Sequence, residues 1–196
     1  MARIQTDKDK SRKEVILRAA AHLFHKKGYK SASMRDLASQ VGVEAASLYN
    51  HIRSKTELLH DICFNTANLY WEHLHEIEKS KASPIEKIEK LIRFHIRQII
   101  EHYEEVYVTD REWKHLEEPY LTNYRNQRRD YRKSLAAIIQ EGIDTGYVQF
   151  IDASTAVLII LHAITGVESW HRSYQKIDAT ELENNMVTIF INGLKK

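Results

Sequence analysis

Apolar side chains recur at spacings of three and four along most of the chain, which is the period of helices with one buried face. No segment alternates apolar and polar residues for long enough to predict a strand. The pattern therefore predicts an all-α fold with about nine helices. The expected helices cover residues 11–27, 34–41, 45–51, 55–79, 84–102, 104–115, 118–141, 153–173 and 179–194.

Helix starts are marked by a small polar residue followed three positions later by an acid. In this capping box the two side chains bond otherwise unpaired backbone N–H groups at the first turn. Two glycines, Gly28 and Gly142, are expected to end the helices that precede them. The expected capping pairs are Ser11 with Glu14, Ser33 with Asp36, Ser54 with Glu57, Ser83 with Glu86 and Asp178 with Glu181.

The segment MRDLASQVGVEAASLYNHI, residues 34–52, has the pattern of two short helices joined by a tight turn. Ala38 is small enough for close helix packing, Gly42 tolerates the positive φ of the turn, and Leu48 locks the pair together. This spacing predicts a helix-turn-helix motif, whose second helix presents its outer face to the major groove of DNA. A plain helical hairpin inside a bundle is the alternative.

The outer face of that second helix carries residue types that read DNA. Asn50 suits adenine, Ser47 suits several base edges, and the methyl group of Ala45 suits thymine. The side chains of Tyr49, His51, Arg53 and Lys55 suit phosphates better.

Composition and charge agree with this interpretation. Hydrophobic residues make up 43% and charged residues 29%, and only 6 Gly and 2 Pro are present, which is typical of a helical globular protein. The net charge of +2 hides an asymmetry, because residues 1–60 hold 12 Lys or Arg against 6 Asp or Glu, and the remainder hold 17 against 21. A basic first part indicates a polyanionic partner for that part alone.

The run from Arg12 to Leu59 resembles the DNA-binding domain of the TetR family of bacterial transcriptional repressors. It is similar in its first helix, its G-Y-K-S-A-S turn, its A-S-Q-V-G-V segment and its L-Y-N-H-I-R-S-K-T-E-L ending. The resemblance implies a DNA-binding domain at residues 1–53, with a basic arm at 1–10, and a helical ligand-binding and dimerisation domain at 54–196. It implies phosphate contacts by Ser33, Tyr49, His51 and Lys55, and positions near bases for Ala45, Ser47 and Asn50.

Two positions depart from the family pattern. Glu44 stands where a capping Ser or Thr is usual, and Ala45 stands where a basic residue is common. Both changes weaken the attraction of the recognition helix for phosphates. Either the basic residues from Lys8 to Lys13 compensate, or Glu44 accepts a hydrogen bond from a cytosine amino group. The alternative function is a helical small-molecule-binding dimer with weak or lost operator specificity.

A regulator that responds to a ligand needs a pocket, and two regions suggest one. Residues 111–132 combine arginines with aromatic side chains, which suits a phosphate or carboxylate ligand having an apolar portion, although a solvated helix gives the same pattern. The segment IIQEGIDTGYVQFIDASTAVLIILHAITGVESWHRSY resembles TetR-like repressors that respond to acyl-CoA thioesters, in which the helix with Gly166, Trp170 and Arg172 borders the pocket. The candidate ligand residues are Arg111, Trp113, His115, Tyr124, Arg125, Arg128, His162, Gly166 and Trp170.

The last two predicted helices carry surplus apolar surface. Residues 153–173 are apolar on more than one face, with Ala163 and Gly166 small enough for close approach, and residues 179–194 add a second apolar stripe. Such surfaces predict a symmetric four-helix interface in a homodimer. The operator is then expected to be a near-palindrome.

Other functions find little support. The close pair His22 and His25 has no acidic third ligand near it in sequence, so no metal site is expected, and neither a catalytic arrangement nor a cofactor motif is found. The single cysteine, Cys63, excludes an internal disulfide. The charged N-terminus is no secretory signal, and no run of about 18 apolar residues is evident, so a cytoplasmic protein without membrane association is expected.

Overall fold

The structure is a computed structural model that describes residues 7–172 and 177–196, with side chains from residue 12 onward except that of residue 172. Within these ranges the chain forms ten α-helices and one 3-10 helix, and its single β-bridge joins Val148 to Lys195. The predicted all-α fold is confirmed. The helices are α1 (Asp7–Lys27), α2 (Met34–Val41), α3 (Ala45–Leu48), α4 (Lys55–Lys79), α5 (Pro84–Glu101), α6 (Tyr103–Arg111), η1 (Trp113–His115), α7 (Tyr120–Asp144), α8 (Ala153–Thr165), α9 (Glu168–Arg172) and α10 (Ala179–Leu194).

The chain divides into two compact units. The first unit contains the described part of Met1–Thr66 together with Glu104–Tyr124, and the second contains Ala67–Tyr103 and Arg125–Lys196. The long helices α4 and α7 contribute to both units, so each unit is built from separate stretches of sequence.

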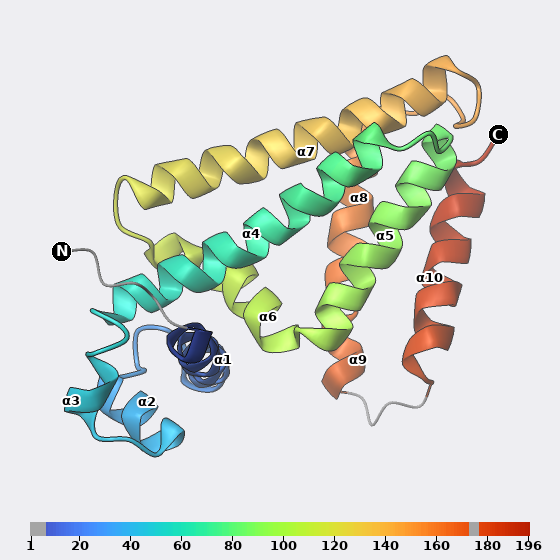
Figure 1. Ribbon diagram of the computed structural model, residues 1–196. Helices are drawn as coiled ribbons and strands as arrows, with labels where there is room; N and C mark the ends of the chain where they lie inside the picture. The colour runs from blue at the N-terminus through green and yellow to red at the C-terminus, as the bar shows by residue number, and fades with distance from the viewer. Residues whose placement is uncertain (1–6, 173–176) are drawn as a thin grey trace. The chain divides into compact units, whose positions relative to one another are not determined.

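In the first unit α1 packs against α2, and α2 packs against α3 (Figure 1). The predicted capping box starts α2: Ser33 Oγ accepts from the Asp36 N–H at 3.1 Å, and Asp36 Oδ2 accepts from the Ser33 N–H at 3.0 Å. Helices α2 and α3, with 8 and 4 residues, are too short to persist alone, so the burial of apolar side chains against α1 stabilises them. The innermost side chains are those of Phe24, Leu37, Leu48, Ile52 and Leu58, each at most 1% exposed.

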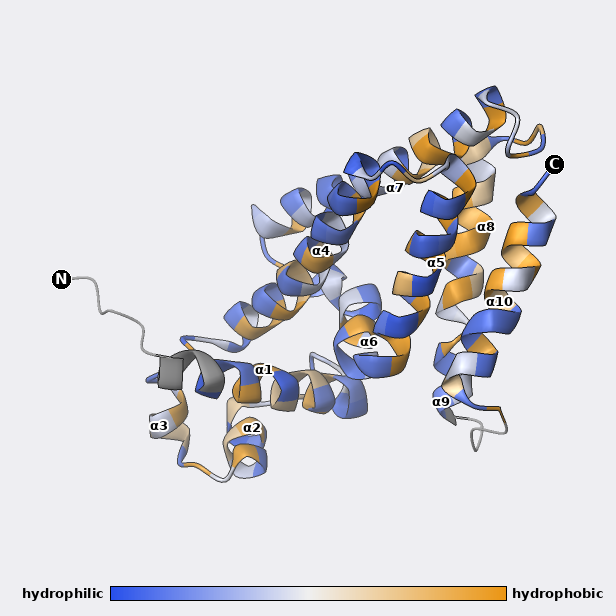
Figure 2. Ribbon diagram, turned by 45° about the vertical axis from the view of Figure 1, so that its right-hand side comes forward, coloured by the Kyte–Doolittle hydropathy of each residue, from blue (hydrophilic) through white to orange (hydrophobic). Residues whose placement is uncertain are grey.

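In the second unit α5 lies beside α8 and α10 (Figure 1). The start of α5 has the expected capping box of Ser83 with Glu86, and Pro84 occupies its first turn. Figure 2 shows hydrophobic positions along α5, α8 and α10, and α8 is the most continuously apolar of them. The core of this unit includes Leu91, Ile96, Val157, Ile164 and Val187.

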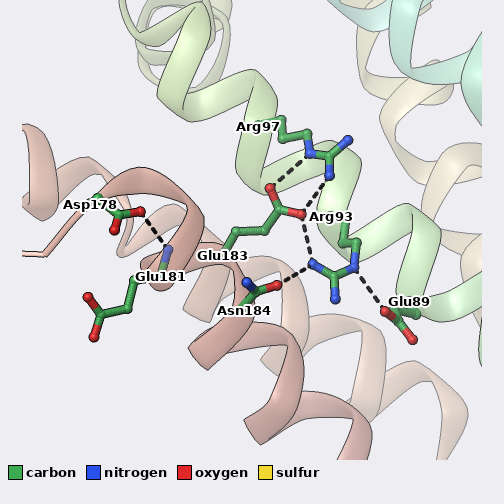
Figure 3. A network of polar contacts seen from close by, with 7 residues as sticks. All are labelled: Glu89, Arg93, Arg97, Asp178, Glu181, Glu183 and Asn184. Atoms are coloured by element: carbon green, nitrogen blue, oxygen red, sulfur yellow. Dashed lines mark hydrogen bonds and ion pairs between the residues drawn. The ribbon is translucent and has the colours of Figure 1, made fainter.

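An ion-pair network joins α10 to α5 (Figure 3). Glu183 of α10 is 7% exposed, and its carboxylate accepts from Arg93 Nη1 at 2.9 Å and from Arg97 Nε at 2.8 Å. Burial raises the pKa of Glu183, but the hydrogen bonds from Arg97 and Arg93 outweigh it and leave the pKa below its usual value. The carboxylate therefore stays charged and holds α10 on α5.

Two predicted helix boundaries were wrong. The first helix begins at Asp7, so Ser11 lies inside it; no Gly or Pro interrupts residues 7–11. Helix α7 continues past Gly142 to Asp144, and the positive φ of 78° that follows belongs to Gly146. Gly142 is needed for space instead, because a Cβ there would lie 2.6 Å from Val148 Cγ2.

The predicted helix at 153–173 is broken in two. Helix α8 ends at Thr165 and α9 begins at Glu168, while residue 173 lies outside the described ranges. Between them the N–H groups of Gly166 and Val167 bond to carbonyls three residues back, at Ala163 and Ile164, both at 3.0 Å. These tighter turns bend the chain away from the α8 axis. The predicted helix at 104–115 is likewise divided, into α6 and η1.

The expectation that no apolar stretch is long enough to span a membrane was also wrong. Residues 153–171 reach that length with a mean hydropathy of 1.3, and 33% of this window is buried. By length and composition alone, the core helix of a folded domain passes the same test.

Candidate nucleic-acid interface and effector cavity

The turn between α2 and α3 has the geometry that its sequence predicts. Gly42 follows α2 with φ 74° and ψ 34°, a left-handed conformation that favours glycine. The Val43 N–H donates to the Ala38 carbonyl at 3.0 Å, which closes the turn. Ala38 and Leu48 are 3% and 0% exposed, so both lie at the contact between the two helices, as expected. The segment is therefore a helix-turn-helix.

Helix α3 is shorter than the predicted 45–51. Its α-helical part is Ala45–Leu48, and the chain continues in turns in which Asn50 and His51 donate to the carbonyls of Ser47 and Leu48, at 3.2 and 3.0 Å. Glu44 occupies the N-cap position, but its side chain makes no capping hydrogen bond. An uncapped start stabilises a helix less than a Ser or Thr cap, which agrees with the short α3.

The residues expected to contact bases and phosphates gather on and beside α3. Tyr49 is 52% exposed, Asn50 is exposed, and Ala45, Ser47 and His51 are half-buried. Their side chains are therefore accessible on one short segment, and their DNA contacts stay a prediction.

Ser33 is exposed at the start of α2, and its hydroxyl donates to Asp36 Oδ2 at 2.7 Å. A hydrogen bond from Lys27 Nζ to Asp36, with those from Ser33, lowers the pKa of Asp36 to about 2. The carboxylate that orders this end of α2 is therefore charged at neutral pH, and the contact of Ser33 with a phosphate stays a prediction.

Lys55 holds the turn between α1 and α2. Its Nζ donates to the carbonyls of Tyr29 and Ala32 at 2.9 Å and to that of Lys30 at 3.3 Å, and it lies 4.5 Å from the centre of the Tyr29 ring. An ammonium has three protons, so these carbonyls engage all of them. A phosphate contact by Lys55 stays a prediction, and it requires the exchange of at least one of these bonds.

Four of the predicted ligand residues belong to the first unit. Arg111 lies over the Tyr107 ring at 4.8 Å, His115 stacks on Tyr29 at 5.5 Å, and the rings of Trp113 and Tyr124 are 5.9 Å apart. Tyr124 is 1% exposed, so its ring is part of the core. The structure brings Trp113 and Tyr124 together and engages all four in contacts within this unit.

The other five belong to the second unit and are dispersed along it. Arg125 and Arg128 lie on α7, and His162 is exposed on α8 with Nδ1 2.8 Å from the Leu158 carbonyl. Gly166 follows α8, and Trp170 Nε1 donates to the Ile177 carbonyl at 2.9 Å. Their role in ligand binding stays a prediction.

A cavity between α5, α7 and α8 in the second unit contains none of these nine residues. It is partly open to solvent, and its wall exposes only apolar surface. The cavity could not be predicted from the sequence, because its residues come from three separate helices and each alone resembles an ordinary core position. The lining residues are Ile88, Leu91, Ile92, His95, Leu135, Ile139, Val157, Ile160, Leu161 and Ile164.

His95 is the one polar side chain in this wall. Its Nε2 lies 2.7 Å from the Tyr131 hydroxyl, and Tyr131 is 8% exposed. Burial, with a smaller contribution from the nearby His73, lowers the pKa of His95 to about 3, and burial raises the pKa of Tyr131. Both groups are therefore uncharged at neutral pH, and the cavity is suited to an apolar guest.

Within the described residues, no three His, Cys, Asp or Glu side chains converge in a way that could hold a metal ion. Cys63 is buried and free of disulfide bonds. The first unit thus has a helix-turn-helix, and the second has an apolar cavity. This combination defines the class of ligand-binding, DNA-binding regulators.

Two protein-family models match the chain. Residues 16–62 match the model described as bacterial regulatory proteins of the tetR family, and residues 81–194 match the model of the tetracyclin repressor-like C-terminal domain. The chain therefore belongs to the TetR family and is a DNA-binding transcriptional regulator. The family suggested by the sequence motifs is confirmed.

Curated relatives are repressors and regulators of similar length. The chain is 23% identical over 188 residues to the HTH-type transcriptional repressor KstR2 of Mycobacterium tuberculosis, which covers 95% of this chain and 94% of that protein. It is 24% identical over 181 residues to the fatty acid metabolism regulator protein of Bacillus subtilis, with 91% and 93% covered.

Solved structures share the fold along nearly the whole chain. The ketosteroid transcriptional regulator KstR2 of Mycobacterium tuberculosis superposes with a TM-score of 0.86 at 23% identity, covering 94% of this chain and 95% of that one. AibR, solved in complex with isovaleryl coenzyme A and operator DNA, gives a TM-score of 0.80 at 22% identity, covering 91% and 97%. At this identity the likeness concerns the fold.

Proposed function

We propose that this regulator is a repressor that leaves its operator when a small-molecule effector enters the cavity between α5, α7 and α8. The observation that carries the proposal is the pairing of an exposed helix-turn-helix with an apolar cavity in the same chain. A ligand changes DNA binding only if it has different affinities for the DNA-binding and released conformations. The cavity supplies the place where such a difference arises.

The effector we propose has an apolar portion and is an acyl-CoA or a related catabolic intermediate. The cavity wall supports an aliphatic chain or ring, because Leu, Ile and Val form it almost entirely. Relatives add support: AibR was solved with isovaleryl coenzyme A, and the Bacillus subtilis relative is named a regulator of fatty acid metabolism. The nine residues predicted from the sequence would then contact parts of the ligand that lie outside this cavity.

The domains we propose are a DNA-binding domain at residues 1–53, with a basic arm at 1–10, and a ligand-binding and dimerisation domain at 54–196. Residues 1–6 of the arm lie outside the described ranges. Within the DNA-binding domain and at its end, Ser33, Tyr49, His51 and Lys55 are proposed to contact phosphates, and Ala45, Ser47 and Asn50 to lie near bases.

A homodimer formed through α8 and α10 follows from their exposed apolar side chains. Leu158 and Ile159 of α8 are 54% and 58% exposed, and Ile189 of α10 is 71% exposed. Covering them in a symmetric four-helix interface removes them from water. The two recognition helices of such a dimer lie about 34 Å apart or a multiple of it, so the operator is a near-palindrome. We place the protein in the cytoplasm with the DNA, and assign it no catalytic role and no cofactor.

A gel shift with the DNA upstream of its own gene tests this proposal. We expect a discrete complex with this DNA and none with a scrambled duplex of equal length. We also expect acyl-CoAs of a graded series of chain lengths to dissociate the complex. A complex that forms equally well on both duplexes would remove the repressor assignment.

Glu44 supports a second candidate, a ligand-binding dimer with weak operator specificity. Its carboxylate stands at the N-cap of α3 without a capping bond, where it repels phosphates. If Glu44 only repels phosphates, Glu44→Ser should raise the affinity for all duplexes in the same gel shift. If Glu44 reads a cytosine, the substitution relaxes specificity at one base pair instead.

A further inference from the structure

The cavity between α5, α7 and α8 has an apolar wall but a strongly basic helix at one edge. Between Tyr120 and Leu135, α7 carries five basic residues and one acid, Asp130. Asp130 pairs with Arg129 at 3.0 Å and with Lys133 at 3.7 Å. The charge of Arg132 is therefore not balanced by an acid of this segment.

Arg132 is next to the cavity along the helix. The cavity residues Leu135 and Ile139 follow Arg132 and Arg128 on one stripe of α7, at intervals of four, three and four residues. Leu135 lies about 4.5 Å further along the helix axis than Arg132, which is less than one turn. The preceding residue, Tyr131, shares its hydrogen bond with His95 in the cavity wall.

Among the described residues, Arg132 makes no hydrogen bond or ion pair. Two basic residues of α5 differ, because Lys87 pairs with Glu141 at 3.4 Å and Arg93 pairs with Glu183 at 2.9 Å. Burial and the neighbouring Arg128 lower the pKa of Arg132, so its environment disfavours the positive charge. An anion placed beside Arg132 would relieve both effects.

We propose that Arg132 binds the anionic group of an effector whose apolar chain occupies the cavity. The wall exposes carbon alone, so a polar head has to lie outside it, and Arg132 is the nearest uncompensated charge along α7. The ligand class is an amphiphilic anion, with either a carboxylate or a phosphate as its head. A guanidinium binds both groups through paired hydrogen bonds. This inference rests on the proposed effector role of the cavity.

Three compounds with one chain length separate the contributions of tail and head. Octan-1-ol has the chain and no charge, octanoate adds a carboxylate, and octanoyl-CoA carries phosphates. Calorimetric titration of the full-length protein at low salt should show at least one anion binding about tenfold or more tightly than octan-1-ol, since charge-assisted hydrogen bonds are worth that much. Arg132→Gln should abolish this preference and leave the affinity for octan-1-ol unchanged.

Arg129→Gln is the matched control, because Arg129 is an exposed arginine of the same helix that Asp130 already pairs. It should keep the preference for the anion. Loss of affinity for octanoate alone in Arg132→Gln identifies a carboxylate as the head, and loss for octanoyl-CoA alone identifies a phosphate; both results support the proposal.

Two outcomes would overturn it. If the anions bind no more tightly than octan-1-ol, or if the preference survives Arg132→Gln, Arg132 has no role in the site, while the binding of octan-1-ol still supports the cavity as an effector site. If none of the three compounds binds, the proposed effector role of the cavity fails together with the arginine site.

Discussion

His22 Nδ1 and Glu104 Oε1 lie 2.5 Å apart, although 82 residues separate them in the chain. His22 belongs to α1, the helix on which α2 packs, and Glu104 stands in the first turn of α6. His25, one turn after His22, has its Nδ1 3.9 Å from the same oxygen and its ring 4.5 Å from that of Tyr107. Glu104 therefore links the start of α6 to α1, and we expect a shift of α6 to act through it on α1 and the helix-turn-helix.

Replacing Glu104 should uncouple effector binding from DNA release. Glu104→Gln removes the charge that α1 and α6 share, so we expect operator binding to persist while the effector-induced loss of affinity shrinks by about fivefold or more. Fluorescence anisotropy with operator DNA, with and without effector, measures both quantities. Glu105→Gln removes the same charge one residue further along and should leave the response intact. Equal responses to the effector in the wild type, Glu104→Gln and Glu105→Gln would rule out coupling through the contact of Glu104 with α1.

Lys55 should stabilise the first unit through backbone carbonyls. Lys55→Met leaves the carbonyls of Tyr29, Lys30 and Ala32 without their donor, so we expect a loss of about 1–3 kcal/mol in the free energy of unfolding, measured by urea denaturation. The control Lys30→Met changes an exposed lysine of the same turn and should cost little. Unchanged stability with weaker DNA binding would instead favour the phosphate contact predicted from the sequence.

Position 142 should not tolerate a side chain, even that of alanine. A Cβ at this position would lie 2.6 Å from Val148 Cγ2 and 3.3 Å from Pro84 Cβ, so Gly142→Ala should destabilise the protein by about 1–3 kcal/mol. Adding Val148→Ala should recover part of the loss caused by the clash. Gly193→Ala meets no atom within 4 Å and should be neutral or stabilising in a thermal melt. If the two alanine variants melt alike, the close packing at Gly142 is refuted.

The half-buried His95 should make the protein less stable in mild acid. Its pKa is about 3 when folded, below the ordinary value of 6.5, so the unfolded chain binds a proton there that the folded chain does not. The stability is complete above pH 6.5 and falls as the pH drops toward 3, by at most roughly 2 kcal/mol between pH 7 and 5. Urea denaturation at both pH values should show this slope reduced in His95→Gln.

His75→Gln serves as the control for that slope. The His75 side chain is 56% exposed, so its replacement removes one imidazole without changing the wall of the cavity. A wild-type slope that survives His95→Gln unchanged would show that folding does not change the protonation of His95.

Local sequence signals predicted most of the fold. A capping residue and its partner three positions on bond each other within one turn, so Ser33 and Ser83 marked the starts of α2 and α5 correctly. The positive φ of Gly42 and the burial of Leu48 follow from equally local rules. The helix start predicted at Ser11 was wrong, because the same pattern also occurs inside a longer helix.

The position of the cavity could not be predicted from the sequence. His95, Leu135 and Ile160 meet in its wall from three helices, and each continues an ordinary helical stripe of apolar residues. Periodicity shows which face is buried but does not show where packing leaves space. The break after Thr165 was missed for a similar reason, since no proline marks it.

The most direct test of the central claim is the anisotropy of a fluorescent duplex carrying the upstream operator, titrated with the protein in the absence and presence of octanoyl-CoA. In the wild type we expect octanoyl-CoA to weaken binding about tenfold or more. In Leu161→Trp, whose larger side chain fills the cavity from its wall, we expect operator binding without this response. Release of DNA from Leu161→Trp at the same concentration of octanoyl-CoA would contradict the account.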